Sequence, residues 1–336
     1  MHNLLDPAIL FFVFGLLAGA VRSNLEIPPA ISRFLSLYLL MALGLKGGFA
    51  LSASGFTHEV LASLGAAMAL ALLVPLAGYH LLRTFVPAFD AAALAATYGS
   101  VSAVTFVTAV QHLETQQIAY GGHMAAAMAL MESPAILMAV LFANHLRMRA
   151  SSPAAVGVSG GAAVLGPGFQ KQGTPLGKIV HESFTDGAQL LLLGAMVVGL
   201  VTGESGKAAM QPFSGDLFKG MLSFFLLDMG LSAARNLPHV RHQSPWLIAY
   251  ALVGPLVHAG LALGMSLALS LPAGDGALLM VLAASASYIA VPAVLRHALP
   301  EANPSLYVGL SLGVTFPLNL IFGIPLYTGL ASRCLG

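Results

Sequence analysis

The sequence predicts an all-α fold, that of a polytopic membrane protein with ten transmembrane helices in two inverted five-helix repeats. Three observations lead to this prediction. Of the 336 residues, 57% are hydrophobic and 36 more are Gly, whereas only 8% are charged, against about 25% in a soluble domain. Long apolar runs recur along the whole chain, and motifs of the first half return in order in the second. Too few charges are present to cover a water-facing surface, so lipid is the expected solvent.

Ten apolar runs have the length of a membrane-spanning helix, which needs about 20 residues. These runs are residues 7–21, 28–45, 59–82, 91–111, 121–146, 181–201, 214–234, 245–270, 275–297 and 304–331. The one long connection, residues 147–180, is rich in Gly, Ser, Pro and Ala and is predicted to be a linker. The chain therefore divides into an N-terminal half of residues 1–146, the linker, and a C-terminal half of residues 181–336. No Lys or Arg precedes the first run, so we interpret it as a span and not as a cleaved signal.

The basic residues are unequally divided between the two sides of this topology. With ten spans, both termini lie on the same side. That terminal side carries Lys46, Lys207, Lys219 and Arg333, and the other ten of the 14 Lys and Arg lie on the linker side. The positive-inside rule therefore predicts a cytoplasmic linker and both termini outside. The expected location of this multi-pass protein is the cell inner (plasma) membrane.

The composition also argues against several classes of function. The net charge is +1, and no basic runs are interleaved with aromatic residues, so no nucleic-acid partner is expected. Cys334 is the single cysteine, which excludes an internal disulfide framework and any multi-cysteine metal site.

The two halves share motifs in the same order. The run 34–40 (Phe-Leu-Ser-Leu-Tyr-Leu-Leu) returns as residues 221–227 (Met-Leu-Ser-Phe-Phe-Leu-Leu), and Gly99–Ser102 returns as Ala284–Ser287. With five spans in each half, a homologous second half must be upside down relative to the first. The alternative is a chance likeness between apolar helices. Inverted repeats are typical of secondary transporters, because two related halves can rock about a central site.

The fourth and ninth spans are each interrupted near the middle by a hydroxyl-rich segment. These segments are residues 98–105 (Tyr-Gly-Ser-Val-Ser-Ala-Val-Thr) and 285–292 (Ser-Ala-Ser-Tyr-Ile-Ala-Val-Pro). Free backbone groups at this depth must face protein or a wet cavity. Pro292 fits the first position of a new half-helix, and we expect the partner half-helix to start between Ala103 and Val107. Two half-helix N-termini that meet at the midplane suit a small anion, since they carry partial positive charge and free N–H groups.

Hydroxyl side chains at the breaks are the candidate ligands. They are candidates either for the anion or, together with carbonyl groups, for a sodium ion, and they comprise Ser100, Ser102, Thr105, Ser285 and Ser287. The alternative is that each hydroxyl only bonds back to the preceding helical turn.

Ionisable residues inside the membrane are costly and usually functional. Glu132, two residues before Pro134, is a candidate for ion coupling, with a structural hydrogen bond as the alternative. Asp228 is expected to serve helix packing. His123 and His258 are expected to be hydrogen-bonded core residues, because no two histidines have metal-ligand spacing on one helix.

Motifs over nearly the whole chain are similar to those of a known family. They are residues 98–105, 113–114, 118–120, 131–135 and 143–144 in the first half, and 283–287, Pro292, 295–296, Pro300, 302–305, 324–326 and 329–331 in the second. In this order they resemble the sodium-dependent bicarbonate transporters of the cyanobacterial SbtA type.

The resemblance implies a core domain (spans three to five and eight to ten) that moves against a gate domain (spans one, two, six and seven). It also implies a homotrimer, bicarbonate bound between the broken helices, sodium as the coupling ion with no other cofactor, and a PII-like regulatory protein at the cytoplasmic face. The substrate site would comprise Ser102, Ala103, Val104, Thr105, Tyr288, Val291 and Pro292. Tyr288 stands where the family has an aspartate, a natural sodium ligand, and Ala290 and Val291 stand where it has Ser and Gly. Ala103, Val104 and Val291 make the lining less polar than the family's pattern.

The predicted function is sodium-coupled uptake of bicarbonate by alternating access. The alternatives are a carrier for another small monocarboxylate, a proton-coupled anion carrier that uses Glu132, and a passive anion channel on the same scaffold. An intramembrane enzyme is not expected, since the chain has no His-Glu-x-x-His motif and no evident pair of nucleophile and base.

Overall fold

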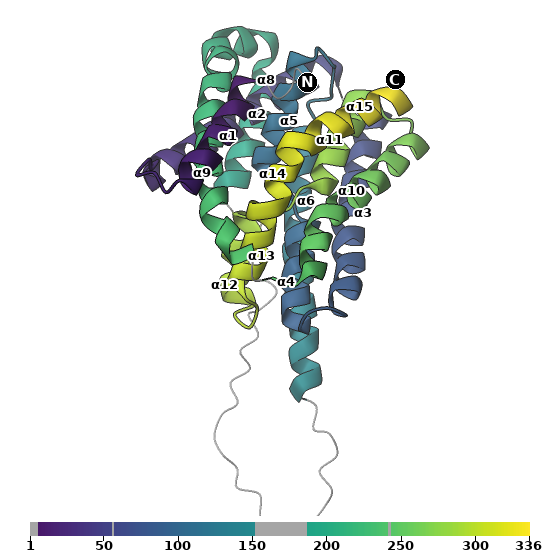
Figure 1. The fold of residues 1–336 in the computed structure, drawn as a ribbon. Helices are drawn as coiled ribbons and strands as arrows, with labels where there is room; N and C mark the ends of the chain where they lie inside the picture. Colours follow the sequence, from purple (N-terminus) through teal and green to yellow (C-terminus); the bar gives the residue numbers. More distant parts are fainter. Residues whose placement is uncertain (1–5, 56, 152–186, 241–242) are drawn as a thin grey trace, which may run out of the picture.

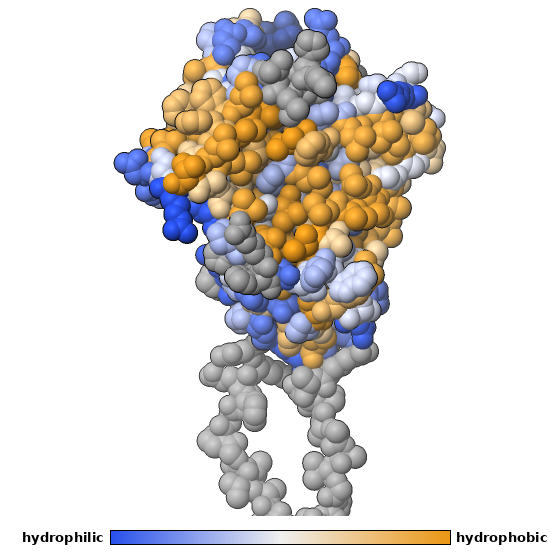
Figure 2. All heavy atoms as spheres, in the orientation of Figure 1, coloured by the Kyte–Doolittle hydropathy of each residue, from blue (hydrophilic) through white to orange (hydrophobic). Residues whose placement is uncertain are grey.

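The computed structural model describes residues 6–55, 57–151, 187–240 and 243–336, and it contains no strand within them. The predicted all-α class is therefore confirmed for this part of the chain. Seven helical segments among the described residues are long and apolar enough to cross a membrane. Figure 2 shows a broad apolar band on the visible face, with hydrophilic residues gathered toward the two ends. This is the surface expected of a polytopic membrane protein.

The helices of the first half are α1 (Pro7–Ala20), α2 (Pro29–Ser54), α3 (His58–Leu82), α4 (Ala88–Gly99), α5 (Ala103–Thr115) and α6 (Met124–Ser151). Those of the second half are α8 (Gly187–Gln211), α9 (Phe218–Val240), α10 (Pro245–Ala268), α11 (Ala273–Ala284), α12 (Ala290–Ala298), α13 (Pro304–Leu310), α14 (Phe316–Leu318) and α15 (Ile324–Cys334). Three π-helical turns join them, η2 (Pro212–Asp216), η3 (Ser311–Thr315) and η4 (Asn319–Gly323). Several helices begin with proline, whose missing N–H costs nothing there.

Each predicted span falls on one helix or on a series of adjoining helices, but some bounds differ. The helix α6 continues past residue 146 to Ser151, so the first five residues of the predicted linker are helical. The rest of the linker and the start of the sixth predicted span, residues 152–186, lie outside the described residues. The last span contains two π-helical turns, which residue periodicity does not reveal. By length, α1 and α11 are shorter apolar helices, and Gly187–Pro238 is one 52-residue stretch, so the number of ten spans stays a prediction.

Four helices, α1, α2, α8 and α9, form a group that we call the panel. Within it α1 packs along α9 and α2 packs along α8, and Figure 1 shows these helices together on one side of the molecule. Glycines allow the backbones to touch. A Cβ atom on Gly48 would lie 2.1 Å from the Met196 carbonyl oxygen, and one on Gly15 would lie 2.3 Å from that of Leu227. Small residues at such crossings are a common device of membrane helix packing.

The other helices, α3–α6 and α10–α15, form a second group that we call the bundle. The two short helices α4 and α11 lie at its centre. Every residue from Ala91 to Gly99 of α4 and from Gly274 to Ala284 of α11 is buried. Both segments are rich in Ala, so neighbouring helices approach them closely on all sides. Figure 1 marks both chain ends at the same end of the molecule, opposite the end at which α6 finishes.

Candidate functional site

Two helical rods are interrupted inside the bundle, as the sequence predicts. The first break lies between α4, which ends at Gly99, and α5, which begins at Ala103. Ser100 and Ser102 have extended backbones. Ser102 caps α5, since its hydroxyl oxygen accepts a hydrogen bond from the Thr105 N–H at 3.2 Å. The partner half-helix therefore starts at Ala103, within the predicted interval.

The second break comprises Ser285–Ile289, between α11 and α12. The Ser287 hydroxyl oxygen accepts from the Val291 N–H at 3.2 Å. Because α12 begins at Ala290, Pro292 is its third residue, and the prediction that it is the first was wrong. The proline is tolerated because no N–H group of the first helical turn has an intrahelical acceptor.

The two breaks are bonded to each other. The Ser102 N–H donates to the Ser285 hydroxyl oxygen at 3.0 Å, and that hydroxyl donates to the Leu282 carbonyl at 2.9 Å. In the other direction the Ser287 N–H donates to the Thr97 carbonyl at 2.9 Å. All of these residues are buried. The segments that are related by sequence are thus adjacent in space.

Several buried hydroxyls around the breaks have no hydrogen-bond partner among the described residues. They belong to Thr97, Ser100, Thr105 and Tyr288. The Tyr288 hydroxyl lies near Ser102 but makes no hydrogen bond of standard geometry with it. Burying an unpaired hydroxyl costs about 1–3 kcal/mol. A bound ion would remove this cost, because hydroxyl oxygens can donate to an anion or coordinate sodium, and so the residues present fit both kinds of ion.

A cavity of about 80 Å³, the central cavity, lies where the breaks meet the panel. Ser102, Ala103, Val104, Ser287 and Tyr288 line it from the breaks, and Glu132 lines it from α6. The other predicted site residues, Ser100, Thr105, Ser285, Val291 and Pro292, are not part of this lining. Three of these, Ser100, Thr105 and Ser285, are 1% exposed and belong to the hydrogen-bonded region of the breaks.

The panel supplies part of the lining, and sequence reasoning missed this. The panel residues are Ser36 and Leu40 on α2 and Ala188, Gln189 and Leu192 on α8. Ser36 belongs to a repeated motif, and Gln189 is a buried amide in an apolar run. For Ser36 and Gln189 alike, the sequence signal that could have identified them was a polar residue within a predicted span. Met128 of α6 completes the apolar part of the lining.

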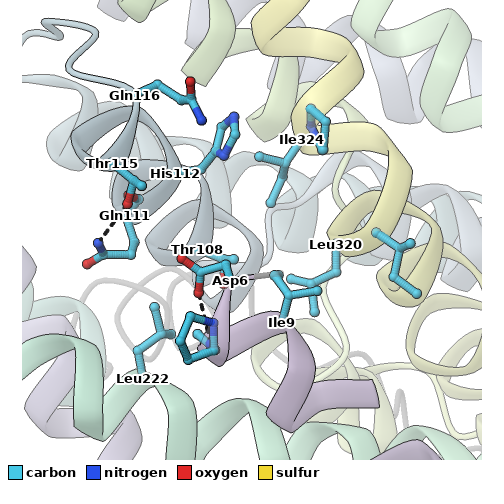
Figure 3. A pocket seen from close by; sticks show the side chains of 14 residues that line it. Asp6, Ile9, Thr108, Gln111, His112, Thr115, Gln116, Leu222, Leu320 and Ile324 are labelled. Atoms are coloured by element: carbon cyan, nitrogen blue, oxygen red, sulfur yellow. Dashed lines mark hydrogen bonds between the residues drawn. The ribbon is translucent and has the colours of Figure 1, made fainter. Parts of the chain in front are cut away.

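A larger cavity of about 380 Å³, the terminal-end cavity, also lies between the panel and the bundle. Figure 3 shows it between the start of α1, the end of α5, Leu222 of α9 and the segment from Leu320 to Ile324. Thr108 lines it one helical turn beyond Thr105. Asp6 caps α1 through the Ala8 N–H at 2.8 Å and forms an ion pair with Lys219 at 3.2 Å. His112 and Gln116 lie in the upper part of this view, on the far side of the cavity from Leu222.

The predicted intramembrane ionisable residues are placed as follows. Asp228 is buried and accepts a hydrogen bond from the Ser32 hydroxyl at 2.5 Å. His123 Nε2 lies 3.5 Å from Asp275 Oδ2, and both side chains are buried. His258 is buried on α10. Within the described residues no three His, Cys, Asp or Glu side chains are grouped as metal ligands.

Two comparisons with known proteins address the family of the chain. A search of curated proteins finds no match. A family model described as the Na+-dependent bicarbonate transporter superfamily matches residues 7–332, which is nearly the whole chain. With its broken helices, its buried hydroxyls and this match, the chain belongs to the Na+-dependent bicarbonate transporter superfamily.

Proposed function

We propose that the chain takes up bicarbonate together with sodium, by alternating access around the two breaks. As a member of its superfamily it is a transporter and not an enzyme. In this proposal sodium is the coupling ion and not a resident cofactor. The observation that carries the proposal is the pair of hydrogen-bonded breaks with unpartnered buried hydroxyls beside the central cavity.

The proposed anion site is at the N-termini of α5 and α12. It comprises Ser102, Ala103, Val104, Thr105, Tyr288, Val291 and Pro292. Both N-termini supply partial positive charge and N–H groups of the first turn. Bicarbonate has four heavy atoms, and a cavity of about 80 Å³ holds several waters and therefore has room for it. Since Ala103, Val104 and Val291 are apolar, backbone N–H groups would provide most of the recognition.

The proposed sodium site is formed by Ser100, Ser102, Ser285, Ser287 and Glu132. The unpartnered Ser100 hydroxyl and the carboxylate of Glu132, which lines the central cavity, support this assignment. Carbonyl groups at the C-terminal ends of α4 and α11 are further oxygen ligands of the kind that sodium uses in broken helices. An inward sodium gradient and the membrane potential would drive uptake, each charge contributing about 2.3 kcal/mol per 100 mV.

We propose ten spans in two inverted halves, residues 1–146 and 181–336, joined by the cytoplasmic linker 147–180. Helix pairing supports this, because exchanging the halves converts the α1–α9 pair into the α8–α2 pair. The same exchange converts the elements around the terminal-end cavity into those around the central cavity. In this scheme the panel is the gate domain, the bundle is the core domain, and the two cavities lie on the two routes to the breaks.

The remaining assignments follow the resemblance and the charge distribution. We propose an inner-membrane homotrimer surrounded by lipid, with both termini outside and a PII-like regulatory protein at the cytoplasmic face. The smaller number of Lys and Arg on the terminal side supports this orientation.

Uptake of labelled bicarbonate into proteoliposomes tests the function. We expect saturable uptake that rises several-fold with an inward sodium gradient. Thr105→Ala should reduce it strongly, because the substitution removes an unpartnered hydroxyl at the break. Ser63→Ala is the matched control, since Ser63 is another buried, unpartnered hydroxyl but lies on α3.

The other outcomes separate the alternatives. Saturable flux without sodium stimulation would contradict sodium coupling, and loss of that flux in Glu132→Gln would then favour a proton-coupled carrier. Flux of another small monocarboxylate in place of bicarbonate would change the substrate. Flux that neither saturates nor depends on a second ion would identify a passive channel.

A further inference from the structure

Asp228 is a buried carboxylate that the proposed transport cycle does not use. It lies near the middle of α9, in the panel, and is 9% exposed. A carboxylate at this depth of a membrane protein is costly, and such residues usually take part in ion or proton movement. Its presence in the panel of an anion transporter therefore needs a specific explanation.

The surroundings of Asp228 contain no cation in ion-pair contact. Its hydrogen-bond donor is the Ser32 hydroxyl of α2, at 2.5 Å, and no described residue forms an ion pair with it. Arg235, two turns further along α9, interacts with it only electrostatically, and its guanidinium donates to the Leu25 carbonyl at 3.3 Å. The other ionisable residues on elements packed against α9 are Arg33, Tyr38 and Lys46 on α2, Asp216 in η2 and Tyr307 on α13.

Asp228 lies close to the wall of the central cavity. One helical turn beyond Ser32, Ser36 lines that cavity. Tyr288, which lines the cavity from the second break, interacts electrostatically with Asp228. An anion in the central cavity and an ionised Asp228 would therefore repel each other through a medium of low dielectric constant.

We propose that Asp228 is a proton-binding site that is linked to the anion, with the carboxyl protonated when the central cavity is occupied and ionised when it is empty. The proton comes from water on the side to which the site is open and returns to water after release. Ser32 suits both states, because a hydroxyl can donate to the carboxylate and accept from the protonated acid. This inference rests on the proposed function, and it adds a proton to the proposed anion and sodium.

The test measures the apparent bicarbonate affinity of the full chain in proteoliposomes from about pH 6 to about pH 8.5, a range that lies on both sides of neutrality. The same series of bicarbonate-ion concentrations is used at every pH, sodium is saturating, and uptake by empty liposomes is subtracted to remove carbon dioxide diffusion. We expect the affinity of the wild type to fall with rising pH, by at most about tenfold per unit for one linked proton. In Asp228→Asn, which is permanently neutral, the affinity should stay near the wild-type low-pH value throughout.

A second variant keeps the test decisive if Asp228→Asn does not fold. Ser32→Ala removes a hydrogen bond to the ionised carboxylate, so the fall in affinity should move to higher pH. The inference would be overturned if Ser32→Ala left the fall in bicarbonate affinity at the wild-type pH. It would also be overturned if the pH dependence of the affinity persisted in Asp228→Asn. Sodium-driven uptake with identical profiles in all variants would reject only the proton site. Absence of any uptake by the wild type would instead reject the proposed function and with it this inference.

Discussion

Ser285 and Ser100 occupy matching positions in the two breaks, but their hydroxyls are bonded differently. The Ser285 hydroxyl accepts from the Ser102 N–H and donates to the Leu282 carbonyl, whereas the Ser100 hydroxyl is buried without a partner. We expect Ser285→Ala to destabilise the protein by about 1–3 kcal/mol, since it leaves a buried N–H unpaired. Ser100→Ala should be nearly neutral without sodium and should reduce the stabilisation that sodium provides.

Thermal unfolding in detergent, with and without sodium, measures both effects. Equal destabilisation by the two substitutions in the absence of sodium would contradict the difference in bonding. An unchanged sodium effect in Ser100→Ala would remove Ser100 from the proposed ion site.

At the scale of single residues, the sequence indicated the chemistry but not the bonding. The serines stood out because hydroxyls interrupt two apolar runs, and the structure places them together. Nothing in the residue order distinguishes Ser285, which bridges the breaks, from Ser100, which does not. The contribution of Gln189 was also missed, because it depends on how α8 docks against the break, and docking is a tertiary property that periodicity does not encode.

At the scale of helices, the panel depends on backbone contact. A Cβ atom on Gly48 of α2 would lie 2.1 Å from the Met196 carbonyl oxygen and 2.7 Å from the Leu200 nitrogen of α8. Gly48→Ala must therefore push the two helices apart, at a cost of about 1–3 kcal/mol. We expect a lower melting temperature in detergent for this variant.

Gly194→Ala is the control for this prediction. Gly194 lies on the same pair of helices, on α8, but a Cβ atom there would have nothing within 4 Å. Alanine is a better helix former than glycine, so this variant should be as stable as the wild type or more stable. A melting temperature for Gly48→Ala equal to that of Gly194→Ala would show that the close approach is not required.

The positions of the helices could be predicted because an apolar run of about 20 residues indicates a membrane-spanning helix. The ends of the helices were harder to predict. The α6 helix continues into the predicted linker up to Ser151, since residues 147–151 include no proline or glycine to end it. Pro292 was misplaced by two residues because a proline fits anywhere in the first turn. The π-helical turns η3 and η4 have no simple sequence signature and follow from packing against α9, α10 and α11.

At the scale of the whole molecule, one ion pair between described residues joins the panel to the bundle. Lys46 of α2 lies 2.9 Å and 3.0 Å from the two carboxylate oxygens of Glu114 of α5, and the Tyr120 hydroxyl donates to the same carboxylate at 3.0 Å. The Lys46 and Glu114 side chains are 19% and 32% exposed. Both lie on the terminal side of the breaks. In the proposed alternating-access cycle, opening of the terminal side would separate Lys46 from Glu114, so we expect this pair to favour the closed state.

Breaking this pair should increase the population that is open on the terminal side. A partly exposed pair contributes about 1 kcal/mol or less, which corresponds to a shift of up to about fivefold. We expect Glu114→Gln to speed modification of the thiol introduced by Thr108→Cys, a buried position that lines the terminal-end cavity, in a Cys334→Ser background. The double variant Lys46→Glu with Glu114→Lys exchanges the two charges and should restore the slow rate of thiol modification. Unchanged labelling in Glu114→Gln would show that the pair has no part in closure.

Direct attachment of one interrupted rod to the other has a consequence for stoichiometry. Because main-chain groups of Ser102, Ser287 and Thr97 take part in the hydrogen bonds between the breaks, the two rods would move as one unit in the proposed transport cycle. An ion bound to either rod would then move together with an ion bound to the other, and coupled transport of the two ions would need no signal between distant sites.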